Sequence, residues 1–156
     1  MGKIEKNHVA KIGIIVDDIE AAAKHYAEVF GIDMPEIGIT PDKLPPVEGG
    51  RETYTQYKGG ETAGKVKYAV IPLEPIYIEL IQVVEPSSPW NDYKEKHGEG
   101  VNTITLYVDD LEKDIDVMKT KGYSMTFKQE KGKQRYAYFD TRKDMGITLD
   151  LKEVDK

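Results

Sequence analysis

The chain contains no cysteine, only three histidines and a single tryptophan among its 156 residues. The absence of cysteine excludes disulfide bridges, thiolate metal sites and a cysteine nucleophile, and it fits a reducing compartment. No segment approaches the roughly 18 consecutive apolar residues of a membrane span. Residues 1–10 also lack the apolar core of a signal peptide. We therefore expect a cytoplasmic protein with no membrane partner.

Basic residues are outnumbered by acidic ones. The 28 Asp and Glu residues exceed the 22 Lys and Arg residues, which gives a formal net charge of −6 and a pI near 5.2. A main partner made of nucleic acid would call for a basic surface, so this class of function is excluded. With 39% hydrophobic and 32% charged residues, the composition is that of an ordinary globular protein. A chain of this length fits one domain that buries roughly 70% of its unfolded surface.

Two stretches of the sequence repeat one pattern at an offset of 103 − 11 = 92 positions. Residues 11–20 (KIGIIVDDIE) and residues 103–112 (TITLYVDDLE) each combine an alternating apolar strand with Val-Asp-Asp and the start of a helix. The second aspartate of each motif, Asp18 or Asp110, is predicted to cap the N-terminus of that helix. The repeat indicates a tandem duplication whose two copies share one cleft.

A second repeat, residues 67–72 against residues 135–140, has an offset of 68 positions. Together the two offsets predict an α+β fold, in which tandem β-α-β-β-β modules form an open, curled sheet of eight strands around a cleft. We expect a single domain over residues 1–156, made of module one (8–86), a linker (87–100) and module two (101–152). Residues at matching positions of the modules are expected to face one shared site.

The difference between the two offsets places 24 extra residues in module one. Most of them lie between Asp33 and Gly64, in a segment with four prolines and two glycine pairs. This composition predicts a long loop with one short strand around residues 51–58. A loop of this length in a compact domain often serves as a lid or a pocket wall.

The tandem modules with Val-Asp-Asp in each copy resemble the vicinal oxygen chelate superfamily of glyoxalases, bleomycin-resistance proteins, extradiol dioxygenases and methylmalonyl-CoA epimerases. The resemblance is sharpest to the epimerases, around residues 82–86 (QVVEP) and 97–101 (HGEGV). It implies a U-shaped cleft in which four side chains hold a divalent metal, usually His, Gln or Glu, His and Glu. It also implies a homodimer and a small-molecule ligand, for which an acyl-CoA is one possibility.

The metal-binding positions of this family project onto Lys11, Gln82, Thr103 and Asp150. Two histidine ligands are thus replaced, one by a hydroxyl and one by an ammonium group that has no lone pair and repels a cation. None of the three histidines of the chain has a ligand partner at a spacing diagnostic of a metal site. We therefore expect no tightly bound metal cofactor.

Lys11 and Asp150 are expected to face each other across the cleft floor. They form either a structural salt bridge in an abandoned metal site or a catalytic pair, in which the ammonium stabilises an enolate and a carboxylate removes an α-proton. Glu48 and Glu52, on the inserted segment, are further candidates for the acid or base. Candidates for contacting the ligand are Gln82, Thr103, Tyr68 and Tyr136, with Lys65, Lys67, Lys133 and Arg135 for a phosphate group.

Two functions are compatible with these residues. The epimerase-like linker favours an isomerase or lyase that acts by proton transfer α to a carbonyl, with a degenerate metal site. The altered ligand set favours a non-catalytic protein that binds a hydrophobic or aromatic small molecule, as the bleomycin-resistance branch does.

Overall fold

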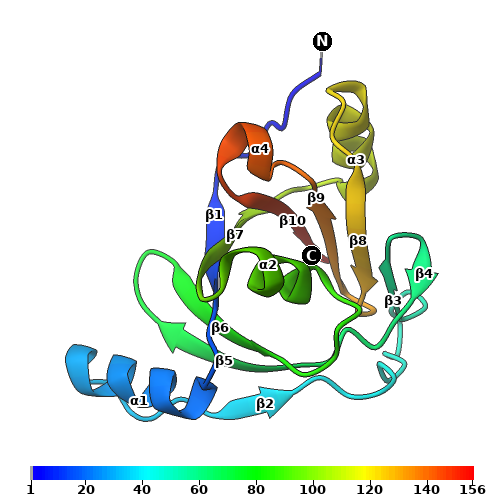
Figure 1. The fold of residues 1–156 in the computed structure, drawn as a ribbon. Helices are drawn as coiled ribbons and strands as arrows, with labels where there is room; N and C mark the ends of the chain where they lie inside the picture. Colours follow the sequence, from blue (N-terminus) through cyan, green and yellow to red (C-terminus); the bar gives the residue numbers. More distant parts are fainter. Residues whose placement is uncertain (1) are drawn as a thin grey trace.

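A computed structural model describes residues 2–156 as four helices and one mixed sheet of ten strands (Figure 1). The strands are β1 (Val9–Ile15), β2 (Ile37–Ile39), β3 (Tyr54–Tyr57), β4 (Gly60–Glu61), β5 (Val66–Pro72), β6 (Tyr77–Val83), β7 (Gly100–Tyr107), β8 (Met125–Glu130), β9 (Gln134–Phe139) and β10 (Thr148–Val154). The helices are α1 (Ile19–Phe30), α2 (Pro89–His97), α3 (Leu111–Thr120) and α4 (Arg142–Met145). The strand order is β2-β5-β6-β1-β7-β10-β9-β8-β3-β4.

Eight of the ten strands form the two modules, β2-β5-β6-β1 and β7-β10-β9-β8. In each module the first strand runs parallel to the last, β1 to β6 and β7 to β10. At the centre β1 and β7 pair antiparallel, with Lys11 opposite Thr105 and Gly13 opposite Thr103. At the offset of 92, Lys11 is equivalent to Thr103 and Gly13 to Thr105, so each of these residues lies opposite the equivalent of the other, as two-fold symmetry requires. The predicted α+β fold of two related modules is confirmed.

The Val-Asp-Asp motifs cap helices as the sequence predicts. Asp18 accepts a hydrogen bond from the backbone N–H of Ala21 (3.1 Å), and Asp110 accepts one from the N–H of Lys113 (3.0 Å). Each carboxylate satisfies one of the backbone donors that the first turn of a helix leaves free. α1 ends at Gly31 with a left-handed φ of 65°, a conformation that costs glycine little.

Helices cover both faces of the sheet. α1 packs on the outer face of module one and α3 on the outer face of module two, and each buries an apolar cluster there. α2 lies over the inner face, where its Trp90 joins Ile15, Phe127 and Tyr138 in a third cluster. Because successive side chains of a strand point to opposite faces, each strand supplies both the helix-covered core and the inner surface of the cleft.

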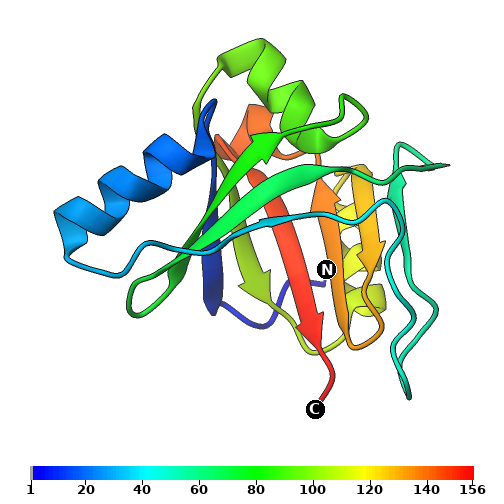
Figure 2. The ribbon, with the colours of Figure 1, turned by 90° about the horizontal axis from the view of Figure 1, so that it is seen from below.

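The inserted segment differs from the prediction in two places. The strand expected around residues 51–58 exists as β3, but β3 pairs with β8 of module two rather than within module one. The edge strand of module one is instead β2, in a stretch expected to be loop, and it pairs with β5. Residues 40–53 therefore run between opposite ends of the sheet, across the open side of the curl (Figure 2). This non-local pairing turns the insertion into a cover for the cleft.

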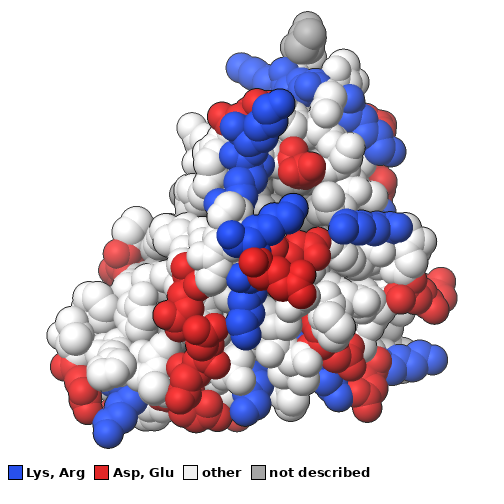
Figure 3. Space-filling view, viewed as in Figure 1, with Lys and Arg blue, Asp and Glu red and all other residues white. Residues whose placement is uncertain are grey.

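The face that carries α2 and α4 shows Lys and Arg side chains beside Asp and Glu side chains (Figure 3). Some of these residues form ion pairs, such as Lys58 with Asp92 (3.4 Å) and Lys94 with Asp17 (3.6 Å). Exposed pairs of this kind each contribute little to stability. No helix within residues 2–156 combines the length and the apolar character needed to cross a membrane.

Candidate functional site

A cavity of about 360 Å³ lies on the inner face of the sheet, between the two modules and against the inserted segment. Strands from both modules, helix α2 and residues 40–45 contribute to its wall. The lining residues are Lys11, Thr40, Pro41, Leu44, Pro45, Gly64, Val66, Tyr68, Glu79, Ile81, Trp90, Phe127, Gln129, Lys131, Tyr136 and Tyr138.

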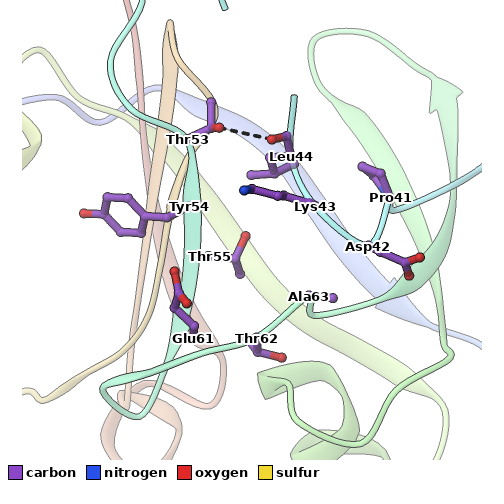
Figure 4. Close-up of a pocket in the computed structure, with 10 residues that line it drawn as sticks. All are labelled: Pro41, Asp42, Lys43, Leu44, Thr53, Tyr54, Thr55, Glu61, Thr62 and Ala63. Carbon is purple, nitrogen blue, oxygen red and sulfur yellow. Dashed lines mark hydrogen bonds between the residues drawn. The ribbon is translucent and has the colours of Figure 1, made fainter. Parts of the chain in front are cut away.

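A second cavity of about 400 Å³ shares Pro41 and Leu44 with the first and extends toward β3 (Figure 4). The hydroxyl of Thr53 donates a hydrogen bond to the carbonyl oxygen of Leu44 (3.2 Å), which joins the inserted segment to the start of β3. Pro41 and Leu44 of the insertion therefore contribute to the walls of both cavities.

Lys11 and Glu79 form an ion pair in the wall of the first cavity. The Lys11 side chain is 6% exposed, and its Nζ donates to Oε1 of Glu79 at 3.0 Å. Burial by itself lowers the pKa of Lys11, but attraction by Glu79, Tyr138 and Asp150 outweighs this effect and raises the pKa well above its usual value. The ammonium group therefore stays charged at neutral pH.

Asp150 is fully buried on β10, opposite Thr105 of β7. The Thr105 hydroxyl donates to Oδ2 of Asp150 at 2.6 Å, whereas Oδ1 has no hydrogen-bond partner within residues 2–156. Burial raises the pKa of Asp150 to about 7, although Lys11 and the Thr105 hydrogen bond act in the opposite direction. Lys11 forms its ion pair with Glu79 and not with Asp150, so the predicted Lys11–Asp150 salt bridge is wrong.

Three aromatic side chains form the apolar wall of the cavity. The ring of Trp90 meets the rings of Phe127 and Tyr138 edge-on, at centroid distances of 5.1 and 5.8 Å, and the last two rings are 4.9 Å apart. Edge-to-face contacts in this range stabilise aromatic clusters beyond simple burial. The cluster offers a flat or hydrophobic ligand a rigid surface close to the Lys11–Glu79 pair.

Positive charge gathers around the ring of Tyr136. The Nζ atoms of Lys11, Lys152 and Lys131 lie 5.2, 5.3 and 5.8 Å from the ring centroid, within the range of cation–π interactions. Lys152 is 8% exposed, and its Nζ is 3.5 Å from the Tyr77 hydroxyl. Burial lowers the pKa of both Lys131 and Lys152.

Gln82, expected beside Lys11, lies on the opposite face of β6. Its Oε1 accepts a hydrogen bond from the N–H of Ile19 (2.9 Å) at the start of α1. The equivalent of Asp150 in module one is Glu79, because β6 and β10 are related by 148 − 77 = 71 positions rather than by the 68 of the second repeat. The connection from β9 to β10 contains α4 and is longer than the connection from β5 to β6. The equivalent position in β6 is therefore three residues away from Gln82, and a shift by an odd number of residues places a side chain on the other face of a strand.

The other predicted residues divide between the cavity and its surroundings. Tyr68 and Tyr136 line the cavity. Thr103 is 1% exposed and packs opposite Gly13 between the central strands. Glu48 and Glu52 are exposed and line neither cavity. Their proposed acid or base role is therefore not supported, because the insertion presents residues 40–45 to the cavity.

Most of the cations expected to contact a phosphate group already have acidic partners. Lys65 pairs with Asp42, Lys67 with Glu20, and Arg135 with Glu112, Glu130 and Glu153. Lys133 is exposed. The ion pairs of Lys65, Lys67 and Arg135 connect parts of the protein to one another, so these three side chains are less available to a ligand.

The side chains at the family's metal position do not suit a divalent cation. Glu79 and Asp150 supply carboxylate oxygens, but the ammonium of Lys11, at the position where the resemblance implies a histidine, is charged and opposes a second cation. Thr103 supplies only a hydroxyl at the matching position. Within residues 2–156, no three His, Cys, Asp or Glu side chains are arranged to hold a metal ion, and the three histidines are exposed.

Sequence reasoning missed Glu79 and Lys131, which line the cavity, and Lys152. Glu79 had a local signal, because it interrupts the apolar run Ile76-Tyr77-Ile78-Glu79-Leu80-Ile81. A carboxylate inside a buried strand requires a partner. This requirement could have indicated that Glu79 lies near the cation of Lys11. Lys131 and Lys152 had no comparable signal, because lysines are common in turns and near strand ends.

Comparison with known proteins relates this geometry to a family. A profile of the Glyoxalase/Bleomycin resistance protein/Dioxygenase superfamily matches residues 10–139. A methylmalonyl-CoA epimerase from Mycobacterium tuberculosis superimposes with a TM-score of 0.65 at 15% identity, covering 100% of this chain and 93% of the epimerase. None of the curated proteins compared matches the sequence significantly.

Two further solved structures are similar. Hypothetical protein BH1468 from Bacillus halodurans C-125 gives a TM-score of 0.63 at 22% identity, covering 95% of this chain and 94% of its own. Methylmalonyl-CoA epimerase from Streptomyces coelicolor, in complex with 2-nitronate-propionyl-CoA, gives 0.63 at 17% identity, covering 97% of this chain and 100% of its own. At these identities the likeness establishes the fold.

Proposed function

Because the chain belongs to the glyoxalase/bleomycin resistance protein/dioxygenase superfamily, we propose that it transfers a proton α to the carbonyl of a small-molecule ligand, as an isomerase of the epimerase kind. The observation that carries the proposal is the Lys11–Glu79 pair in the cavity wall. Its 3.0 Å contact joins a permanent cation to a carboxylate, and the two side chains are only 6% and 19% exposed. A base and an electrophilic group thus stand next to each other in a nearly dry site.

In the proposed reaction Glu79 removes the α-proton and Lys11 stabilises the product of that step. The C–H bond breaks, its electron pair moves toward the carbonyl oxygen, and the proton is bound by the Glu79 carboxylate. The Lys11 ammonium donates a hydrogen bond to the enolate oxygen, which gains strength from the low local dielectric constant. The enolate then turns its other face toward Glu79, which returns the proton to that face of the carbon and gives the epimer.

Asp150 has a positioning role in this scheme. It is fully buried and does not line the cavity, so it contributes charge rather than contact with the ligand. When ionised, it attracts the Lys11 ammonium from the side of the sheet and limits the movement of that group. In this proposal the Lys11 cation takes the electrostatic part that a metal plays elsewhere in the family, and no tightly bound metal is needed.

The proposal is tested by proton exchange in deuterated water. Methylmalonyl-CoA is the first compound to use, followed by a panel of acyl thioesters and 2-oxo acids, with loss of the α-proton signal followed by NMR. Glu79→Gln and Lys11→Met are expected to slow exchange at least about 100-fold, the usual contribution of a positioned acid or base. Glu48→Gln, a change at an exposed glutamate outside the cavity, is the matched control.

Two results would contradict the proposal. One is a wild-type protein that exchanges the α-proton of no compound in the panel, and the other is a Glu79→Gln variant that exchanges as fast as the wild type. An unchanged exchange rate in the presence of EDTA is expected, because no step requires a metal.

The family relationship also supports a homodimer, and analytical ultracentrifugation tests this.

A non-catalytic binding protein is the second candidate, and the aromatic wall of Trp90, Phe127 and Tyr138 favours it. Such a wall binds flat or apolar molecules without any chemistry. A binding protein would retain tight binding of one ligand in Glu79→Gln and would exchange no α-protons. The wild-type exchange assay therefore separates the two functions.

A further inference from the structure

Lys131 and Lys152 are cations beside the Tyr136 ring that have no acidic partner; the side chain of Lys152 is buried, whereas Lys131 is exposed. Within residues 2–156, no Asp or Glu oxygen lies within 4.0 Å of either Nζ atom. Lys11 pairs with Glu79 at 3.0 Å, and Lys128, whose side chain is 14% exposed, pairs with Glu112 at 2.6 Å. The contrast is sharp in a chain whose net charge is −6.

The two lysines without an acidic partner converge on one ring of the cavity wall, that of Tyr136. Both Nζ atoms lie within 6 Å of the Tyr136 ring centroid, at 5.8 and 5.3 Å. Lys131 and Tyr136 line the cavity itself. The Lys152 ammonium is shielded from water and lacks an anion, which is unfavourable. Together with the exposed ammonium of Lys131 it makes the surroundings of the Tyr136 ring positive, and this part of the cavity attracts a negatively charged group from outside the chain.

We propose that the ligand carries an anionic oxygen group, a carboxylate or a phosphate, that binds beside the Tyr136 ring through Lys131, with Lys152 adding positive charge at the same ring. The remainder of the ligand is apolar or aromatic, because Trp90, Phe127 and Tyr138 also line the cavity. This inference deepens the proposed function and rests on it only in placing the ligand in the same cavity.

The single tryptophan of the chain supplies a reporter for this inference. Trp90 lines the cavity, so quenching or enhancement of its fluorescence measures occupancy without any reaction. The probes are 4-phenylbutyrate, 4-phenylbutyl phosphate and the uncharged 4-phenylbutanol. At least one anionic probe is expected to bind with a Kd at least tenfold lower than that of the alcohol, and to weaken as salt is added. The tighter of the two anions identifies the oxygen group.

Variants connect the preference to the two lysines. Lys131→Met is expected to raise the Kd of the preferred anion at least tenfold and to leave the Kd of the alcohol unchanged. Lys133→Met, at an exposed lysine of the same turn, should change neither value. Lys152→Met should weaken the binding of the anion as well. The melting temperature of the free protein should stay the same or rise, because an unpaired buried charge has been removed.

The opposite results overturn the inference. They are equal binding of anions and alcohol, or an anion Kd that Lys131→Met leaves unchanged. A fall in the melting temperature of Lys152→Met without loss of anion binding would assign that lysine a structural role. Because these readouts involve no proton exchange, anion binding without exchange would contradict the proposed function alone, and exchange without a preference for anions would contradict this inference alone.

Discussion

Glu79 and Asp150 occupy equivalent positions in the two modules, yet they meet different surroundings. Each lies on the inner face of a strand that runs parallel to the first strand of its module, Glu79 opposite Gly13 and Asp150 opposite Thr105. Glu79 borders the cavity and pairs with Lys11, whereas Asp150 is sealed inside the sheet. The duplication thus provides two carboxylates, and their packing gives only one of them access to a ligand.

Asp150→Asn is expected to stabilise the protein at pH 8 and to leave its stability unchanged at pH 4. The folded-state pKa of Asp150 is about 7, against 3.8 for a free side chain, so between these values the folded protein holds a proton that the unfolded chain releases. The contribution of this group to stability is therefore present below about pH 4 and is lost as the pH rises to about 7. The difference corresponds to up to about 4 kcal/mol at pH 8.

Urea unfolding at pH 4, 6 and 8 measures this effect. Asp116→Asn, at an exposed position of α3, is the control, and its difference from the wild type should not change with pH. If Asp150→Asn gives the same difference from the wild type at pH 4 and pH 8, the raised pKa is refuted.

Lys11→Met should lower the free energy of unfolding by about 3 kcal/mol, because Glu79 and Asp150 lose the cation between them. The double variant Lys11→Met/Glu79→Gln should recover part of this loss, which gives a coupling free energy above about 1 kcal/mol in a double-mutant cycle. The measurement is chemical denaturation at pH 7.

An exposed pair supplies the comparison for this cycle. Lys24 and Glu28 are 4.0 Å apart with side chains 71% and 61% exposed, and their cycle should give a coupling below about 0.5 kcal/mol. Equal coupling in the two cycles would mean that the Lys11–Glu79 contact has no special importance for stability.

Gly13→Ala should destabilise the protein through a clash with Thr103. A Cβ atom at position 13 would lie 2.2 Å from Oγ1 of Thr103 and 3.6 Å from its Cβ. Thr103 is almost fully buried, so its hydroxyl has little room to move. We expect a loss of about 1–3 kcal/mol, the usual cost of overpacking.

A second substitution checks the cause of this loss. Thr103→Ala removes the clashing oxygen and retains the acceptable Cβ contact, so the double variant should melt at a higher temperature than Gly13→Ala alone. If both variants with Gly13→Ala are equally unstable, the close approach of β1 and β7 at this point is not the reason.

Protein purified without chelator is expected to contain well under one equivalent of transition metal by elemental analysis. Restoring two imidazoles with Lys11→His/Thr103→His should create a zinc site together with Glu79 and Asp150, because the set then contains four neutral or anionic donors. Lys11→Gln/Thr103→Asn is the control and should bind less zinc after dialysis. Stoichiometric metal in the wild-type protein would contradict the assignment of Lys11.

Local patterns in the sequence sufficed to predict the elements that repeat. The offset of 92 identified β1 and β7 as central strands, and the second aspartate of each Val-Asp-Asp motif identified a helix cap, because strand alternation and capping depend on neighbours in the chain. The resemblance to the family, and not the alternation, predicted that Lys11 faces the cleft. None of these features requires knowledge of which distant strands meet.

The tertiary structure alone decided which side chains become partners. Glu79 rather than Gln82 faces Lys11. The connection before β10, which contains α4, is longer than the one before β6, so the residue of β6 equivalent to Asp150 lies three positions earlier than the repeat suggests, on the other face of the strand. β3 joins the edge of module two, and Lys131 and Lys152 meet at Tyr136, because segments far apart in the chain are brought together. Pairing between distant strands is fixed by the packing of the whole sheet. For that reason the sequence predicted the cleft and three of the residues that line it, Lys11, Tyr68 and Tyr136, but not the partners that give the site its chemistry.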